Sequence, residues 1–469
     1  MTIRPSDAER RSTDVHSADV VGVGGGPAGL TAALLAARAG HSVVLVEASS
    51  RLGGMAASPT VAGQRVDLGS HRLHPSVSPV SHRLLEELLG DDLQTRLRHG
   101  RLHLDRRWVG FPLRAGDLVR SVPTRTAVAI GWDLATGSRR QETPDDNYAE
   151  VVRARLGPTV LDRFHGPYAR KVWGVEPQQL SGSLARRRIS LTGAGDVVKR
   201  LRRSRTPQGR TFLYPKLGYG QIVDRLAETA MEAGVQVMTS TRTVTVTPDL
   251  HAPSVGLDDG TLVQAGRVLW TAAPQVLLRA AGTPAPGVLR HRGVVVVYLV
   301  LEIPNYSEWD AHYIPDLDVP FVRLSEPKNY RDGPDPPGRT VLCAEMPSQV
   351  GDAVWRASDG QLQALVLDGM GRLGLSVPAP VQVSTIRLPR VYPVYDNSGA
   401  AVAGRLVAMA EQLPGVTLLG RQGLSVTDNL HHVMDMAWAA VDCLGADGAW
   451  DDARWRLARA RFDTHIVED

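Results

Sequence analysis

The pattern of apolar and polar positions near the start of the chain predicts a strand, a helix and a second strand. An apolar, β-branched run at residues 18–23 leads into a glycine cluster, and an Ala/Leu-rich stretch with helical spacing follows. A second apolar run covers Val43 to Val46. This order of elements is typical of a β-α-β unit in a parallel sheet.

Later segments alternate between helical and strand patterns. Residues 100–206 are Arg-rich with helical periodicity, which predicts an inserted, partly helical lobe. From Gly218 to Glu232 an amphipathic helix leads into strand-like runs that resume the α/β pattern. Residues 291–390 are rich in β-branched and aromatic residues between Pro-containing turns, which favours an antiparallel sheet. The segment GVTLLGRQG and the residues after it predict a strand, a glycine turn and a closing helix.

Composition indicates an ordinary globular protein of two packed lobes. The 469 residues are 43% hydrophobic and 22% charged, and a chain of this length is too long for one simple core. The 53 Lys and Arg barely exceed the 49 Asp and Glu, so the formal net charge of +4 is spread over a large surface. We therefore expect no nucleic-acid partner.

The cysteine content and the length of the longest apolar run indicate where in the cell the protein is expected. Cys343 and Cys443 are too few for a disulfide framework, which favours a cytoplasmic location. Residues 1–17 are charged throughout and lack the apolar stretch of a signal peptide, so we expect a disordered tail. The longest apolar run, Val294 to Leu301, is far shorter than the roughly 20 residues that span a bilayer, and no transmembrane segment is expected.

The glycine cluster has the spacing of a dinucleotide-binding turn. Gly24, Gly26 and Gly29 form G-x-G-x-x-G between the predicted strand and helix, where the helix N-terminus can hold a pyrophosphate. Glu47 ends the second strand, where its carboxylate can accept hydrogen bonds from a ribose. A glycine turn without a ligand is the structural alternative.

A second glycine turn separates FAD from a nicotinamide cofactor. The segment EASSRLGGMA, with Arg51, Gly54 and Met55, resembles the turn that passes beside the FAD pyrophosphate in amine-oxidase and protoporphyrinogen-oxidase flavoproteins. A nicotinamide dehydrogenase does not need this second crossing. A surface turn is the alternative.

The resemblance extends over residues 18–445. The segments VDLGSHRLHP, RWVGFPL, KVWGVEP, FVRLSEP, VYPVYD and TLLGRQG occur in the same order as in the branch of these flavoproteins related to UDP-galactopyranose mutase. It implies an α/β fold, α+β overall, with a Rossmann-like FAD-binding lobe of discontinuous segments and a second substrate lobe. We expect the FAD lobe at 18–100, 207–290 and 391–450, the substrate lobe at 101–206 and 291–390, and a C-terminal extension at 451–469.

The resemblance also implies which residues contact FAD. Val244 matches a residue whose backbone meets the adenine, although a plain strand residue is the alternative. The turn at Gly420 and Arg421, and the helix that begins near Asn429, would place N–H dipoles beside the flavin, with simple helix capping as the alternative. The full set is Gly24, Gly26, Gly29, Glu47, Arg51, Gly54, Met55, Ser70, Val244, Gly420, Arg421, Asn429 and Leu430.

Three residues are candidates for catalysis or substrate binding. His71 lies in the segment that would face the flavin, where an imidazole can transfer a proton or simply be structural. Trp173 matches a pocket-lining tryptophan of the mutase branch, and a core position is the alternative. Arg323 matches an arginine that holds substrate diphosphate, and an internal ion pair with a carboxylate such as Glu345 is the alternative. Tyr395 and Asp396 could flank the same pocket.

Departures from the mutase pattern affect the expected chemistry. Thr427 and Asn429 stand where the sugar mutases carry a tyrosine and an aspartate, and Thr192 stands where a second diphosphate-binding arginine is expected. A metal site at His431 and His432 is not expected, because adjacent helical positions point in different directions.

The sequence therefore predicts an FAD-dependent oxidoreductase. We expect hydride removal from a C–H bond next to nitrogen or oxygen, or a C–C desaturation, in a small biosynthetic metabolite such as a sugar-containing or polycyclic compound. The alternatives are a redox-neutral flavin-dependent mutase acting on a nucleotide sugar, and a non-catalytic binding protein on the same fold. The substrate, the electron acceptor and the oligomeric state do not follow from the sequence.

Overall fold

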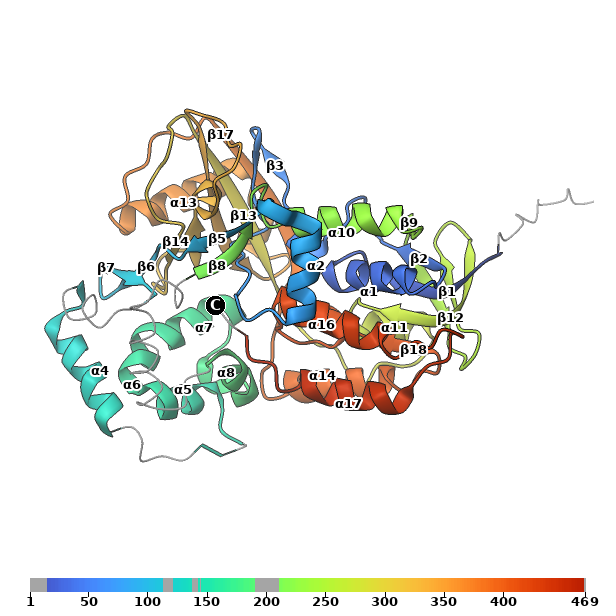
Figure 1. The fold of residues 1–469 in the computed structure, drawn as a ribbon. Helices are drawn as coiled ribbons and strands as arrows, with labels where there is room; N and C mark the ends of the chain where they lie inside the picture. The colour runs from blue at the N-terminus through green and yellow to red at the C-terminus, as the bar shows by residue number, and fades with distance from the viewer. Residues whose placement is uncertain (1–14, 113–120, 137–141, 144, 190–210, 468–469) are drawn as a thin grey trace, which may run out of the picture.

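A computed structural model describes residues 15–112, 121–136, 142–143, 145–189 and 211–467. Two seven-stranded sheets within these residues each carry helices, and Figure 1 shows them as two groups of elements side by side. Thr192, one of the residues discussed above, lies outside the described residues. The fold is mixed α/β, as the sequence predicted.

The first sheet contains the predicted β-α-β unit. Its order is β10-β11-β12-β1-β2-β9, with β18 also beside β12; β1 pairs in parallel with β2 and β12. All four residues of β2 are buried, which explains the unbroken apolar run. The strands are β1 (Val15–Val23), β2 (Val43–Val46), β9 (Gln236–Met238), β10 (Thr243–Thr247), β11 (Ser254–Leu257), β12 (Leu262–Trp270) and β18 (Val416–Leu418).

The first strand corrects the expected boundary of the N-terminal tail. Residues 15–17, which we expected to be disordered, pair in register with residues 262–264 of β12. Polar side chains are tolerated there because this end of β1 lies at the exposed rim of the sheet, where His16 and Ser17 face solvent. The ladder, rather than side-chain burial, therefore holds this end of the strand.

Helices cover the first sheet. The glycine turn leads into α1, which packs against both α10 and α16, and α11 packs against α14. These helices bury Ala, Leu and Val against the strands and form one large core with them. The helices are α1 (Pro27–Arg38), α2 (Pro79–Leu89), α10 (Gln221–Glu232), α11 (Pro274–Ala280), α14 (Gly399–Ala410), α15 (Gly420–Gly423), α16 (Leu430–Val441) and α17 (Asp452–Phe462).

The second sheet confirms the antiparallel pattern expected of residues 291–390. Its order is β17-β13-β16-β15-β14-β6-β7, antiparallel except between β14 and β6. Two helices not foreseen from the sequence, α12 (Ala353–Arg356) and α13 (Asp359–Arg372), join it. The strands are β6 (Gly100–Leu104), β7 (Arg107–Phe111), β13 (His291–Leu301), β14 (Ala311–Tyr313), β15 (Arg323–Ser325), β16 (Thr340–Ser348) and β17 (Gln382–Pro393).

A helical group follows β7, as the sequence predicted for the Arg-rich insertion. Asn147 caps α5 by accepting a hydrogen bond from the Glu150 N–H, and the Glu150 side chain accepts one from the Asn147 N–H. The group comprises α4 (Thr124–Thr136), α5 (Tyr148–Leu156), α6 (Pro158–Val160), a π-helical turn (Leu161–His165), α7 (Gly166–Trp173) and α8 (Gly182–Arg188). Two small sheets complete the fold: β3 (Thr60–Val61) with β4 (Gln64–Arg65), and β5 (Leu93–Leu97) with β8 (Thr211–Pro215).

No helix in the described part of the chain is long and apolar enough to cross a bilayer. Cys343 and Cys443 are both buried free thiols. The division of the chain into an FAD-binding lobe and a substrate-binding lobe stays a prediction. Residues from the segments expected in both lobes line one cavity.

Candidate active site

A cavity of about 550 Å³ has walls from both large sheets. The β1–α1 turn and the end of β2 contribute residues from the first sheet, whereas β13, β15, β16 and β17 contribute residues from the second. This volume is typical of a site for a small molecule or cofactor.

The glycine turn forms one end of the cavity. Gly24 has a φ of +105°, and a Cβ there would lie 2.2 Å from the Thr271 hydroxyl. A Cβ on Gly29 would lie 1.9 Å from the Gly24 carbonyl oxygen, so Gly29 allows α1 to pack on the strand and lies behind the lining. A Cβ on Gly26 would meet no described atom within 4 Å, and Gly26 lines the cavity. The space beside Gly26, at the N-terminus of α1, suits a pyrophosphate.

Glu47 stands at the end of β2 and stiffens the same turn. Its carboxylate accepts hydrogen bonds of 2.7 Å from the Gly25 and Ser49 N–H groups. Glu47 also lines the cavity, as do Gly54 and Met55 of the second glycine turn. The carboxylate is thus fixed by the backbone at the position where the sequence predicts a ribose contact.

A second turn approaches the cavity from the C-terminal part of the chain. Gly420 has a φ of +82° and a Cβ there would lie 2.8 Å from Ala28 Cβ, so the turn requires glycine. Arg421 donates hydrogen bonds of 3.3 Å to the Thr427 and Asp428 carbonyls. Burial, followed by repulsion from Arg188, lowers the pKa of Arg421. The lining includes Gly420, Arg421, Thr427, Asp428, Asn429 and Leu430.

His71 lines the cavity on a loop held by the other sheet. The Ser70 N–H donates a 2.7 Å hydrogen bond to Glu345, and Ser70 also lines the cavity. The His71 ring stacks on Tyr219, with centroids 5.0 Å apart. Burial lowers the pKa of His71, although Asp67 and Glu345 oppose the shift. The imidazole is therefore neutral at neutral pH.

Arg323 faces Glu345 rather than standing alone. Its Nε lies 3.1 Å from a Glu345 carboxylate oxygen, and its Nη1 donates a 3.1 Å hydrogen bond to the Ser70 carbonyl. Burial acts to lower the pKa of Arg323, but the Glu345 carboxylate outweighs it and holds the pKa well above its usual value. The ion pair that the sequence left as an alternative is present.

Trp173 lies one layer behind the cavity wall. Trp173 is buried and is not among the described residues that line the cavity. Its ring meets the Tyr392 ring edge to face, with the two centroids 6.4 Å apart. The Arg188 guanidinium lies 5.1 Å over the Trp173 ring. Both Tyr392 and Arg188 line the cavity, so Trp173 supports residues of the wall.

Four further candidates from the sequence also lie outside the described lining. Arg51 is exposed, and Val244 on the edge strand β10 is 46% exposed. The Tyr395 hydroxyl donates to the Ser425 carbonyl, and Asp396 pairs with Arg290. The roles of Arg51 and Val244 toward FAD stay predictions.

Several lining residues were not singled out from the sequence. Arg188 belongs to the RRR run that precedes the Thr192 position, and this run was the available signal. Tyr313 and Tyr392 lie on strands of the second sheet, and Val467 lies after the last helix. Their positions depend on contacts between segments far apart in the chain, so spacing alone does not reveal them.

The lining fits a dinucleotide flavin. Among the described residues, Arg421 Nε, Thr427 Oγ1 and His71 Nδ1 are buried without a hydrogen-bond partner and belong to lining residues. Together with the space at Gly26 and the N-terminus of α16 at Asn429, they provide hydrogen-bonding groups on two sides of the cavity.

Comparisons with known proteins point the same way. A family model described as flavin containing amine oxidoreductase matches residues 27–390. A Mycobacterium tuberculosis protein described as a flavin-containing monoamine oxidase, AofH, is 28% identical over 198 residues. That match covers 38% of this chain and 42% of the relative, so it spans less than half of the relative's length.

Solved structures share the fold over nearly the whole chain. A reduced UDP-galactopyranose mutase covers 96% of this chain and 100% of its own, with a TM-score of 0.77 and 19% identity. An Exiguobacterium protein assigned as a protoporphyrinogen oxidase covers 92% and 98%, with a TM-score of 0.71 and 20% identity. A redesigned putrescine oxidase covers 91% and 99%, with a TM-score of 0.64 and 17% identity.

Proposed function

The chain belongs to the family of flavin-containing amine oxidoreductases, and from this premise we propose that it oxidises a small molecule at a C–H bond next to nitrogen. Its cofactor is FAD and it is an FAD-dependent oxidoreductase. We infer that the reacting end of the substrate is neutral or cationic, and that the electrons pass to oxygen or to another acceptor.

The Arg323–Glu345 ion pair is the observation that carries the proposal. Because Glu345 neutralises Arg323, this part of the cavity offers little net attraction to a diphosphate. Tyr313 and Tyr392 line the same cavity, and aromatic faces suit an apolar or cationic group. These features support an amine more than an anionic substrate.

Bound FAD supplies the hydride acceptor of such a reaction. The neutral His71 imidazole has an unpartnered ring nitrogen among the described residues, and we propose that it accepts a proton from the substrate nitrogen. Glu345 positions the Ser70–His71 loop through its hydrogen bond from the Ser70 N–H. Arg421 and the N-terminus of α16 stabilise negative charge that develops beside them.

Anaerobic reduction of the enzyme-bound flavin tests this function. The purified yellow protein is mixed without oxygen with matched sets of amines, alcohols and nucleotide sugars, and the visible flavin absorbance is followed. We expect an amine to bleach the flavin and to yield the corresponding imine or its hydrolysis product. Bleaching by alcohols alone would contradict the proposed substrate class, and a protein that cannot be reconstituted with FAD would contradict the function.

The second candidate is a redox-neutral mutase acting on a nucleotide sugar. It is favoured by the position of Arg323 on the cavity wall and by the fold shared with UDP-galactopyranose mutase. It is disfavoured because Arg323 is engaged by Glu345, and because Thr427 and Asn429 replace the expected tyrosine and aspartate. A nucleotide titration separates the two candidates.

A further inference from the structure

The residues after α17 turn back toward the active site. Val467 is 7% exposed and lines the cavity. Its N–H donates a 2.7 Å hydrogen bond to the Arg187 carbonyl at the end of α8. A segment predicted from the sequence only as a C-terminal extension therefore contributes directly to the wall of the site.

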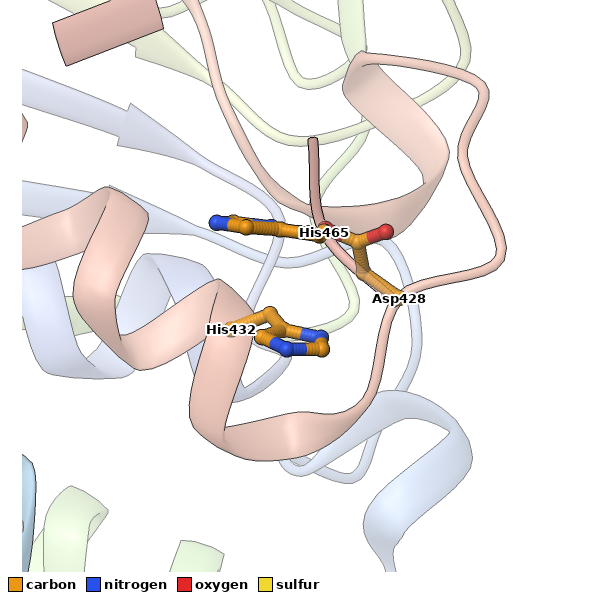
Figure 2. A group of neighbouring side chains, drawn as sticks. All are labelled: Asp428, His432 and His465. Atoms are coloured by element: carbon orange, nitrogen blue, oxygen red, sulfur yellow. Dashed lines mark hydrogen bonds and ion pairs between the residues drawn. The ribbon is translucent and has the colours of Figure 1, made fainter. Parts of the chain in front are cut away.

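His465 attaches this segment to the loop before α16. Its Nδ1 lies 2.6 Å from a carboxylate oxygen of Asp428, whose side chain is fully buried. Arg187 Nη1 lies 3.5 Å from the other oxygen of the same carboxylate. Figure 2 shows the His465 ring lying over the ring of His432, and their centroids are 4.3 Å apart at an interplanar angle of 15°.

The side chains of Asp428, His432 and His465 lie close enough together to suggest a metal site, but their other contacts make them unsuitable as ligands. One ligand atom from each of Asp428, His432 and His465 lies within 4.8 Å of the others. However, His465 Nδ1 already bonds Asp428, and His432 Nδ1 accepts a 3.3 Å hydrogen bond from the Asn429 N–H. The Arg187 guanidinium beside Asp428 also repels a second cation. The arrangement is better explained as a contact that fastens one segment to another.

Asp428 connects this contact to the site. Its carbonyl oxygen accepts a hydrogen bond from Arg421, and both residues line the cavity. We propose that residues 463–467 form a closing wall of the flavin cavity, that His465 and Asp428 fasten it, and that Val467 limits the size of substrate admitted. The limit on substrate size rests on the proposed function. The closing of the cavity by residues 463–467 does not, because it concerns only access to FAD.

Substitution of Val467 tests the wall, with its neighbour as a matched control. Ile466 is 41% exposed, so Ile466→Ala changes the same segment without changing the cavity. In the FAD-loaded protein we expect Val467→Ala to raise the iodide quenching constant of the flavin at least two-fold, and Ile466→Ala to leave it unchanged. Equal quenching constants in the parent protein and in Val467→Ala would overturn the proposal that this segment closes the cavity.

A second substitution separates this inference from the proposed reaction. Val467→Trp should raise KM for the bulkiest active substrate about ten-fold more than it raises KM for the smallest one. Equal effects on substrates of all sizes would overturn the size limit. If no substrate is found, the proposed function fails, but the iodide experiment still shows whether residues 463–467 shield the flavin.

His465→Ala tests the fastening contact, with the exposed His251→Ala as its control. We expect hydrogen exchange at residues 463–467 to accelerate at least ten-fold while α17 keeps its protection, because the bond to a buried carboxylate is lost. Unchanged exchange would overturn the fastening role. Stoichiometric zinc that survives dialysis in the parent and is lost in His465→Ala would also overturn it, in favour of a metal site.

Discussion

Arg323 and Glu345 form a buried ion pair with 3.1 Å between Nε and the carboxylate, and side chains that are 16% and 5% exposed. The pair joins β15 to β16 in the second sheet and reaches the Ser70 backbone on the loop that carries His71. The pair therefore cancels the charge of Arg323 at this part of the cavity wall and holds the loop that carries the candidate catalytic histidine.

Removing one member of this pair should destabilise the protein strongly. Glu345→Gln leaves the buried Arg323 charge without its partner, and we expect the free energy of unfolding to fall by about 3–5 kcal/mol. Urea unfolding of the FAD-free protein measures the loss. The double variant Arg323→Met/Glu345→Gln should be less destabilised than the sum of the single variants; strict additivity would show that the two residues do not interact.

Nucleotide diphosphates should bind weakly at best. A UDP titration of the FAD-loaded protein should leave the flavin spectrum unchanged, because Glu345 already occupies Arg323. Glu345→Gln, provided that it folds, should gain a response. Tight binding of a nucleotide sugar to the parent, abolished by Arg323→Ala, would instead favour the mutase function.

Two glycines of the same turn should respond differently to substitution. Gly26→Val places a side chain in the open space of the cavity, so we expect a folded protein without bound FAD. Gly29→Ala drives a methyl group against the Gly24 carbonyl, so we expect a lower melting temperature before any effect on binding. Melting curves and the flavin absorbance of the purified variants measure both effects; a yellow Gly26→Val protein would contradict the pyrophosphate assignment.

Glu47→Ala should weaken FAD binding while leaving the fold largely intact. The carboxylate is expected to bond the ribose, and its hydrogen bonds are worth roughly 1.5–3 kcal/mol, about ten-fold or more in Kd. Part of the loss will come from the freed Gly25 and Ser49 N–H groups. Glu47→Gln keeps an acceptor and is the matched control. FAD retention equal to that of the parent after gel filtration at low concentration would exclude the ribose role.

His312 should make the protein less stable in acid. Burial, aided by repulsion from Arg101, lowers its pKa to about 3, whereas an unfolded histidine titrates near 6.5. Between these values the unfolded state binds a proton that the folded state does not, so stability falls as pH falls, by about 1.4 kcal/mol per pH unit. His312→Phe should flatten this slope in urea unfolding, and the exposed His251→Gln should not. An unchanged slope in His312→Phe would assign the acid sensitivity elsewhere.

Local sequence predicted the parts of the site that depend on local geometry. Gly24, Gly26 and Glu47 lie where the β-α-β spacing places them, because a turn, a helix N-terminus and a strand end are determined within one short segment. The Arg323–Glu345 pair was available as an alternative, since both residues lie on strands of a predicted sheet.

Features that depend on distant contacts were not predictable in the same way. Val467 and Arg187 are far apart in the sequence, and they come together in a structure where α17 packs on α16. Helix α13 was missed because Gly360, Gly369 and Gly371 lower its intrinsic helix propensity, while packing on the second sheet stabilises it. Trp173 was assigned by resemblance to the pocket lining, and its position behind Tyr392 depends on how the helical group packs.

The cavity takes its walls from two sheets that have separate hydrophobic cores. A molecule that fills the cavity is therefore held by both cores at once, and neither core can unfold without releasing it. Cofactor binding thus acts as a thermodynamic link between the two halves of the protein. The loaded protein should therefore melt in a single cooperative transition at a higher temperature than the FAD-free protein.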